Sequence, residues 1–315
     1  MSRYVVGFDT SNYTTSVALF DGVDGRNVGK LLEVPRGGLG LRQSDALFQH
    51  VKRLPELMEM LCGEQDLRHV AAVGVSTQPR AIEGSYMPCF LAGVSQAHCL
   101  GAALGVPVFS CSHQQGHLAA AAWSAGCLEC LERPFLAWHL SGGTTELLYV
   151  ESKDHQLSAQ IIGGSQDISA GQLIDRTGVA LGLDFPAGKA LDALCAQSQG
   201  SPKPFRVKLQ GLYFSLSGME NKVRDMVQSG VCASDVACFA VDTVVDTVVR
   251  TTLQAQQQYP DVPVLCSGGV ASNSRLRQAM SVRCGAYFPQ PQFSTDNAMG
   301  VAILAHQALA RGDLG

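Results

Sequence analysis

The sequence has no apolar run of the roughly 18 residues that a membrane-spanning helix needs. It is also poor in charge, since 16% of its 315 residues are charged while 46% are hydrophobic. The formal net charge of −4 supplies no positive field, so an RNA partner would have to bind local patches or another subunit. The first residues lead into an expected strand instead of a signal peptide, and we therefore predict a cytoplasmic protein without membrane association.

No disulfide framework is expected either. The 11 cysteines are odd in number and scattered through apolar segments, a pattern typical of reduced, buried thiols. One close pair, Cys127 and Cys130, follows two histidines, His113 and His117. These four residues could form a closed structural zinc site, although two loop thiols are the simpler interpretation.

A repeated pattern divides the chain in two. A strand at 4–9, a polar turn and a strand at 14–20 predict a β-hairpin, and residues 135–150 repeat the same order. Thr14 in the first copy corresponds to Thr144 in the second, an offset of 130 residues. The length is sufficient for two packed lobes, so the pattern indicates two copies of one unit.

Apolar periodicity completes an α/β pattern. It predicts helices at 42–61, 90–104, 167–181, 189–196, 233–258 and 298–310, and buried strands at 70–76 and 262–267. We therefore predict an α/β fold with two similar lobes, each a mixed sheet covered by helices, and a nucleotide cleft between the lobes. The N-terminal lobe would span residues 1–130 and the C-terminal lobe residues 131–315.

The polar turns of both hairpins can offer backbone N–H groups and hydroxyls to an anion. A further turn, Gly268-Gly269, follows an expected core strand at a place where α/β folds let a ligand approach the backbone. Together these turns indicate a nucleotide site. A coincidental Thr-Thr pair in two unrelated hairpins is the simpler alternative.

His113 and His117 follow an apolar strand and begin a helix. Side chains at i and i+4 point the same way on a helix, so both imidazoles could bind one ion such as iron or zinc. Two ordinary half-buried histidines would have the same spacing. A zinc peptidase needs a glutamate beside a histidine, and the intervening residues are Gln114, Gln115 and Gly116, so we expect no peptidase activity.

Asp296 precedes the last expected helix. It is either an N-cap, a position that favours aspartate, or a third metal ligand beside the two histidines. Its spacing does not decide between these two interpretations.

Seven motifs follow one another along almost the whole chain. They are Gly7-Phe-Asp-Thr-Ser11, the segment from Gly105 to Leu118, Leu140-Ser-Gly-Gly-Thr-Thr-Glu146, Asp175-Arg-Thr-Gly-Val-Ala-Leu-Gly-Leu-Asp-Phe-Pro-Ala-Gly188, Phe214-Ser-Leu-Ser-Gly218, Ser267-Gly-Gly-Val-Ala-Ser-Asn273 and Ser294-Thr-Asp-Asn297. Each alone is a weak signal. In this order they resemble the TsaD-type transferases that make threonylcarbamoyladenosine in tRNA, formerly called glycoproteases, of the actin-like ATPase superfamily.

The resemblance implies a metal-dependent acyltransferase that moves a threonylcarbamoyl group from an adenylate to N6 of an adenosine in tRNA. It implies one divalent ion, iron or zinc, held by His113, His117 and Asp296, and it assigns no catalytic residue beyond the metal. Partner subunits of a tRNA-modification complex are also implied. The adenine nucleotide or threonylcarbamoyl adenylate would contact Asp9, Ser11, Ser141, Gly142, Gly143, Thr144, Asp175, Gly188, Asp192, Gly268, Gly269 and Asn273.

The chain departs from the family near the reacting centre. Asn12-Tyr13-Thr14 stand where the family has a Cys-Asp-Glu type sequence, Gln115 replaces a glutamate, and Arg80 lies in place of a Gly-Pro-Gly loop. These changes are typical of a divergent paralogue. Two alternatives therefore stay open: a carbamoyl-type transferase of the same fold with another acceptor, and a non-catalytic nucleotide-binding paralogue.

Overall fold

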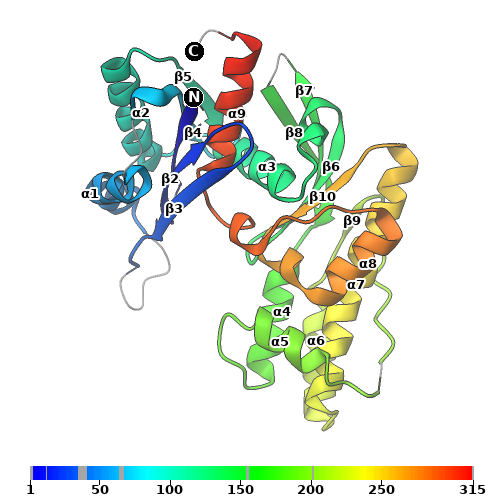
Figure 1. Ribbon diagram of the computed structural model, residues 1–315. Coiled ribbons are helices and arrows are strands. Elements are labelled where there is room, and N and C mark those ends of the chain that lie inside the picture. Colours follow the sequence, from blue (N-terminus) through cyan, green and yellow to red (C-terminus); the bar gives the residue numbers. More distant parts are fainter. Residues whose placement is uncertain are drawn as a thin grey trace. The chain divides into compact units, whose positions relative to one another are not determined.

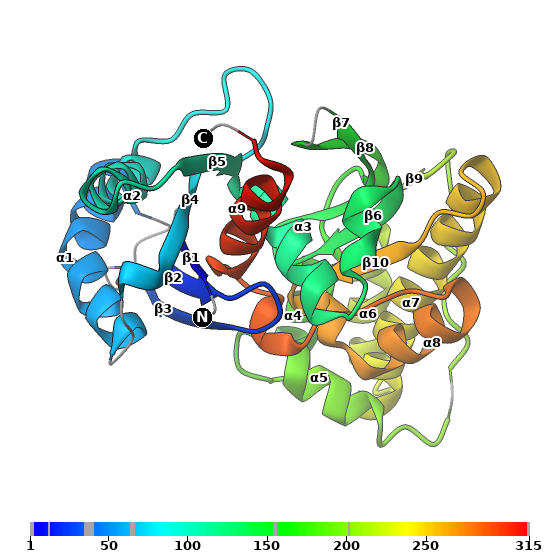
Figure 2. The ribbon, with the colours of Figure 1, turned by 45° about the horizontal axis from the view of Figure 1, so that its top comes forward.

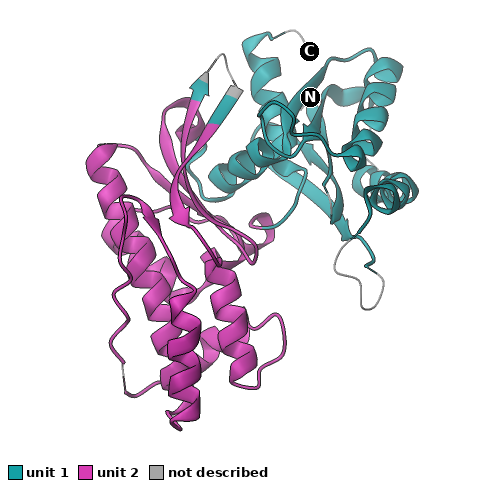
Figure 3. Ribbon diagram, turned by 180° about the vertical axis from the view of Figure 1, so that it is seen from behind, with its two compact units in different colours: residues 1–128, 152–158, 295–315 teal, residues 129–151, 159–294 magenta. Residues whose placement is uncertain are grey.

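The computed structural model describes residues 3–11, 13–34, 41–63, 67–153, 156–200 and 202–313. The chain forms two compact units, which Figure 3 colours separately. Unit 1 comprises residues 1–128, 152–158 and 295–315, and unit 2 comprises residues 129–151 and 159–294. None of the described helices is both long enough and apolar enough to cross a membrane.

The first sheet has the strand order β3-β2-β1-β4-β5 (Figure 1). Its strands are β1 (Tyr4–Thr10), β2 (Thr14–Phe20), β3 (Gly25–Leu31), β4 (Val70–Gln78) and β5 (Val108–Ser112). β1 and β2 form the predicted hairpin, in which Thr10 pairs with Thr15. β4 runs parallel to β1, and β5 runs parallel to β4, so the sheet is mixed.

Helices cover both faces of this sheet (Figure 2). α1 (Gln43–Cys62) and α2 (Leu91–Leu104) pack on one face, while α3 (His113–Ser124) and α9 (Met299–Arg311) pack on the other. Because side chains alternate along a strand, Val6 and Phe8 join the buried cluster with Leu54 of α1, whereas Gly7 faces α9.

Glycines allow α9 to lie close to the sheet. Gly7 and Gly74 are partners across β1 and β4. A Cβ atom at Gly7 would lie 2.6 Å from the carbonyl oxygen of Ala298, and one at Gly74 would lie 2.7 Å from that of Val301. Both distances are shorter than any normal contact, so the helix can occupy this position only above residues without side chains.

A further glycine lies where α9 meets α3. A Cβ atom at Gly300 would collide with the carbonyl oxygen of Gly116 and would lie 2.7 Å from the backbone nitrogen of Ala120. Gly116 lies between His113 and His117, and Asp296 directly precedes α9. The contact between the two helices therefore determines how near the aspartate comes to the histidines.

The second sheet has the strand order β10-β6-β7-β8-β9. Its strands are β6 (Phe135–Leu140), β7 (Thr145–Lys153), β8 (Gln156–Ser165), β9 (Tyr213–Phe214) and β10 (Val264–Ser267). Leu140 pairs with Thr145 in the β6–β7 hairpin, and this register repeats that of Thr10 and Thr15 at the predicted offset of 130 residues. β10 runs parallel to β6.

The α-helices among the described residues of unit 2 are α4 (Ala170–Ala180), α5 (Gly188–Cys195), α6 (Gly218–Gln228), α7 (Ala233–Gln258) and α8 (Ser274–Cys284). The core is built around Trp138 of β6, which is fully buried and donates its indole N–H to Thr252 Oγ1 of α7 at 2.8 Å. Short 3-10 helices lie at η1 (Leu67–His69), η2 (Pro88–Phe90), η3 (Leu128–Glu132), η4 (Gly269–Ser272) and η5 (Pro291–Phe293).

The predicted fold class is confirmed, since the chain builds two mixed sheets covered by helices. Two strands were not predicted, β3 and β8. β3 is a mostly exposed edge strand that contains Gly25 and Gly29, so it lacks the apolar alternation that marks a strand. The division into lobes at 1–130 and 131–315 stays a prediction. The two compact units assign residues 152–158 and 295–315 to unit 1, and α9 in the second of these segments packs on the first sheet.

Replacing Gly300 with alanine should destabilise the protein by about 1–3 kcal/mol, because the new methyl group must push α9 away from α3. The loss would be measured as a lower midpoint of thermal or denaturant unfolding. Gly218→Ala is the matched control, since a Cβ atom at this first residue of α6 would meet no atom within 4 Å. An unchanged midpoint for Gly300→Ala would contradict the close packing.

Candidate metal centre and nucleotide pocket

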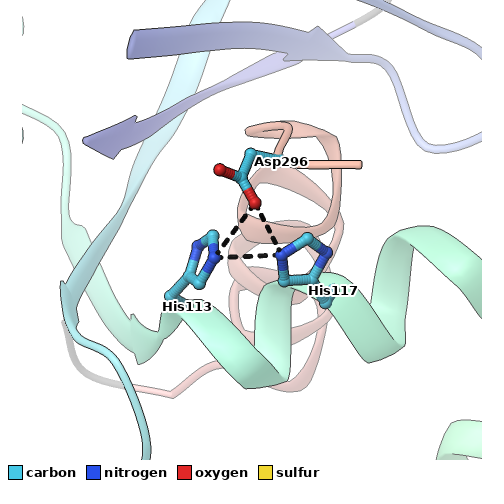
Figure 4. Close-up of side chains that lie close together, drawn as sticks. All are labelled: His113, His117 and Asp296. Carbon is cyan, nitrogen blue, oxygen red and sulfur yellow. Dashed lines mark hydrogen bonds and ion pairs between the residues drawn. The ribbon is translucent and has the colours of Figure 1, made fainter. Parts of the chain in front are cut away.

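Two histidines and an aspartate come together in unit 1 (Figure 4). His113 and His117 lie one turn apart at the start of α3, and Asp296 reaches them from the segment before α9. His113 Nε2 lies 2.9 Å from His117 Nε2 and 3.5 Å from Asp296 Oδ1, and His117 Nε2 lies 3.2 Å from that oxygen. Within the described part of the chain, no other group of three or more His, Cys, Asp or Glu side chains is close enough to share an ion.

The three donor atoms fit a metal ion. Around a tetrahedral ion with bonds of about 2.1 Å, ligand atoms lie about 3.4 Å apart, which is close to the separations found here. Two imidazoles and a carboxylate suit zinc, and the same set occurs in iron sites with open positions. All three side chains are half-buried, so solvent reaches the group.

Asp9, near the end of β1, forms a hydrogen bond with the ring nitrogen of His113 that points away from His117 and Asp296. Its Oδ1 accepts hydrogen bonds from His113 Nδ1 at 2.9 Å and from Ser76 Oγ at 2.5 Å, and the residue is fully buried. His113 Nδ1 donates the proton of this hydrogen bond. The other ring nitrogen, Nε2, faces His117 and Asp296. A carboxylate behind a ligand histidine commonly fixes its tautomer and ring orientation in metal sites.

The surroundings of His113 shift its pKa in opposite directions. Burial lowers the pKa, but the charge of Asp9 and hydrogen bonds to Asp296 and Asp9 outweigh this effect and raise it to about 10. Burial alone would raise the pKa of Asp296, yet hydrogen bonds from His113 and His117 hold it well below the usual range. Without an ion, the group is therefore an imidazolium beside an ionised carboxylate at neutral pH.

The β1–β2 hairpin holds the second oxygen of Asp296. Ser11 Oγ and Thr14 Oγ1 donate hydrogen bonds to Asp296 Oδ2 at 3.0 and 3.1 Å. The sequence predicts nucleotide contacts for Asp9 and Ser11, and a nucleotide contact by either stays a prediction. The structure places Asp9 beside His113 and Ser11 beside Asp296, two of the three candidate metal ligands. Asn12 lies outside the described residues.

Gln115, which lies between the two histidines, has a structural role. Its side chain accepts a hydrogen bond from Ser112 N, and Ser112 Oγ accepts one from Gln115 N, which together form a capping box at the start of α3. Gln115 Nε2 also donates to the carbonyl oxygen of Leu157 at 2.7 Å. These contacts hold the side chain within the core, so it supplies no base to the metal centre.

The closed zinc site with Cys127 and Cys130 receives no support. Both thiols are buried and neither is in a disulfide. Among the described residues, the group that can share an ion contains His113 and His117 with Asp296 and neither cysteine. The thiols belong instead to the apolar interior.

Unit 2 contains a cavity of about 530 Å³, a size that suits a nucleotide. Its walls combine glycine backbone and apolar side chains with two carboxylates, Asp175 and Asp192, and one amine, Lys189. Six residues with predicted nucleotide contacts line it: Gly142, Asp175, Gly188, Asp192, Gly269 and Asn273. Ser141, Gly143, Thr144 and Gly268 are not among its lining residues. The nucleotide contacts themselves stay predictions.

Hydrogen bonds hold the acidic walls of this cavity in place. Asp192 of α5 accepts from Asn273 Nδ2 at 2.9 Å and from the backbone nitrogen and hydroxyl of Ser274, so it joins α5 to the start of α8. Asp175 Oδ1 accepts from the backbone nitrogen of Ala187 at 2.8 Å and fixes the turn before α5. Both carboxylates are therefore oriented before any ligand binds.

The turn after β6 is organised by its own serine. Ser141 Oγ accepts hydrogen bonds from the backbone nitrogens of Gly143 and Thr144 at 3.3 and 3.0 Å. These are the N–H groups that the sequence suggests for a phosphate. The turn rests on the start of α4, since Ser169 Oγ donates to the carbonyl oxygen of Gly142 at 2.7 Å. Gly142 thereby reaches the cavity, while its neighbours stabilise the turn.

The sequence did not single out three residues that the structure brings to these sites. Phe185 and Lys189 line the cavity, and His50 of α1 is buried beside the first hairpin. Phe185 and Lys189 lie within or directly after the motif that ends at Gly188, so their position was a usable signal. His50 gave none, because a histidine within an amphipathic helix has the pattern of a core residue.

The fold is shared with proteins of known structure. One similar structure is component A of the (R)-2-hydroxyglutaryl-CoA dehydratase of Acidaminococcus fermentans. The match covers 98% of this chain and 100% of component A, with a TM-score of 0.56 and 16% sequence identity. At this identity, the similarity concerns the fold alone.

Sequence comparison identifies the family. Residues 35–303 match the family model TsaD, described as tRNA N6-adenosine threonylcarbamoyltransferase, and the chain belongs to this family. The enzyme of that name from Aromatoleum aromaticum is 31% identical, over 99% of this chain and 93% of its own. The one from Streptococcus pneumoniae is 30% identical, over 95% of this chain and 90% of its own. The predicted family and its acyltransferase class are therefore confirmed.

Asp296→Asn should weaken the binding of Zn²⁺ by roughly a hundredfold or more, because the ion loses its one negatively charged ligand. Metal content and affinity would be measured by elemental analysis and by competition with a chelator. Asp313→Asn is the control, since this aspartate lies in the same C-terminal segment and pairs with Arg311. Loss of the ion from Cys127→Ala instead of Asp296→Asn would contradict the ligand set.

Zn²⁺ affinity should rise with pH, about tenfold per unit between pH 7 and 9. The pKa of His113 is raised to about 10, so His113 is protonated in the ion-free protein throughout this range. The stability that this proton contributes is lost only as the pH rises through the pKa of the folded protein. Binding must displace this proton. Asp9→Asn removes the charge that holds it and should flatten the slope, as measured by chelator competition at several pH values. A pH-independent affinity in the unmodified protein would contradict the assignment.

Proposed function

We propose that this protein transfers a threonylcarbamoyl group from an adenylate to N6 of an adenosine in tRNA, or catalyses a close relative of that reaction, with one divalent metal. Family membership over residues 35–303 carries the proposal. It is also supported by the grouping of His113, His117 and Asp296, the three ligands that the resemblance to the family implies.

The cavity of unit 2 would bind the adenylate. Phe185 and Pro186 offer apolar surface for the adenine ring, and Asp175 and Asp192 offer acceptors for ribose hydroxyls. Lys189 provides a positive charge for the phosphate. Because Asp192 is already held by Asn273 and Ser274, it can accept a ribose hydroxyl without reorganising.

His113, His117 and Asp296 would hold iron or zinc, and the bound ion would supply a Lewis acid for the carbamoyl oxygen. Asp9 keeps His113 in the tautomer that presents Nε2. Ser11 and Thr14 keep Asp296 turned so that Oδ1 faces the histidines. No side chain in this group is assigned as a general base.

The proposed acceptor of the threonylcarbamoyl group is an adenosine in tRNA. A net charge of −4 does not favour tRNA binding by this chain alone, so partner subunits would contribute to it. One observation favours a different acceptor as a second candidate. Thr14, which stands where the family has an acid, donates to Asp296 instead of offering a carboxylate near the substrate.

The protein should convert threonylcarbamoyl adenylate and unmodified tRNA into threonylcarbamoyladenosine and AMP when candidate partner subunits are present. Nucleosides from digested tRNA would be measured by mass spectrometry, and AMP would be measured in the same samples. Asn273→Ala should reduce both products by at least tenfold, because it removes a lining residue and frees Asp192. Asp313→Asn should leave both unchanged.

Three results separate the candidates. Equal amounts of modified adenosine and AMP support the proposed reaction. AMP without modified tRNA, but with a carbamoylated small acceptor, would assign the second candidate. Binding of the adenylate without release of AMP in any mixture would indicate a non-catalytic nucleotide-binding paralogue and would overturn the proposal.

A further inference from the structure

His50, in the middle of α1, is fully buried and belongs to neither the metal ligands nor the nucleotide cavity. Its Nε2 lies 2.8 Å from the carbonyl oxygen of Ser11, and its Nδ1 lies 2.8 Å from Thr15 Oγ1. A carbonyl oxygen only accepts, so Nε2 must donate to Ser11. Burial lowers the pKa of His50 to about 4, so the ring is neutral and Nδ1 accepts from the hydroxyl of Thr15. Both nitrogens are thus used, and their roles are fixed.

Ser11, the residue that His50 holds, is also in contact with Asp296, one of the proposed metal ligands. Ser11 accepts from His50 through its carbonyl oxygen and donates through Oγ to Asp296 Oδ2 at 3.0 Å. Thr14 Oγ1 donates to the same oxygen at 3.1 Å. With Oδ2 held by two hydroxyls, the other oxygen of Asp296 lies 3.2 Å from His117 Nε2 and 3.5 Å from His113 Nε2.

We infer that His50 is a positioning residue of the metal centre, which acts through Ser11 to orient Asp296 as a ligand through one oxygen. This inference rests on the metal site of the proposed function. The position of the Ser11 backbone determines where its hydroxyl lies, and the hydroxyl determines which oxygen of Asp296 turns toward the histidines. Partners of this kind around metal ligands commonly contribute about 10–100-fold to affinity.

If His50 only stabilised α1, its replacement would have a different effect on metal binding. A core histidine would affect the metal only by loosening α1, so any equally destabilising change in that helix would have the same effect. Leu61 provides this comparison, since it is buried at the far end of α1 in the cluster with Val6 and Phe8. Leu61 takes no part in the hydrogen bonds that join Ser11 to His50 and to Asp296.

The test compares His50→Gln, His50→Asn, His50→Phe and Leu61→Ala in the full-length protein, titrated with Co²⁺ and followed by visible absorption. A glutamine amide nitrogen can replace Nε2 and keep the bond to Ser11, whereas the shorter asparagine reaches only the position of Nδ1 near Thr15. We expect His50→Gln to bind within a few-fold of the unmodified protein. His50→Asn and His50→Phe should bind roughly 10–100-fold more weakly. Leu61→Ala should lower the unfolding midpoint without changing the affinity.

A double variant isolates the route through Ser11. Ser11→Ala should weaken Co²⁺ binding by a similar factor, and adding His50→Phe to it should cost little more, because both changes break one chain of contacts. Additive losses, or equal losses for Leu61→Ala and His50→Phe, would overturn the inference while leaving the metal site in place. If the unmodified protein binds no Co²⁺, both the metal site and this inference fail.

Discussion

The contact between α3 and α9 is the interaction on which the grouping of His113, His117 and Asp296, the candidate metal centre, depends. Asp296 and His117 are 179 residues apart, and they meet because Gly116 and Gly300 leave no side chain between the two helices. Paired glycines in β1 and β4 allow α9 to lie equally close to the sheet. Because interiors are packed as densely as crystals, a methyl group at this crossing would move a ligand by a large fraction of a metal bond length.

Around that contact, buried polar groups hold the ligands in one arrangement. Asp9 is fully buried, yet its Oδ2 makes no hydrogen bond to any residue that the structure describes. An unpaired buried carboxylate oxygen is costly, and here its charge is offset by the proton on His113 and, when an ion binds, by that ion. Asp9 thus places an acidic side chain directly behind His113, an arrangement that is compatible with a cation at the candidate metal centre.

The local features of this arrangement could be predicted from the sequence, and the long-range ones could not. The two hairpins and the His113/His117 spacing follow from periodicities within a few residues, and the structure reproduces both hairpins in matching register. The Ser112 and Ser169 capping boxes were visible signals as well, since each has glutamine three residues later. Spacing left the role of Asp296 open, because the aspartate joins the histidines only through the packing of α9. The role of His50 depends on hydrogen bonds to a hairpin that precedes it by more than 30 residues.

The departures from the family sequence change the charge near the candidate metal centre and leave His113, His117 and Asp296 in place. Where the family has an acid, Thr14 donates a hydrogen bond to the carboxylate that would bind the ion. A hydroxyl donor withdraws electron density from Asp296, whereas a second carboxylate would add a negative charge close to it. With Asp9 and Asp296 as the nearby carboxylates, a divalent ion would be neutralised without excess negative charge. Such an ion would still be able to polarise a carbonyl oxygen. The loss of acids at this hairpin is therefore compatible with transfer chemistry.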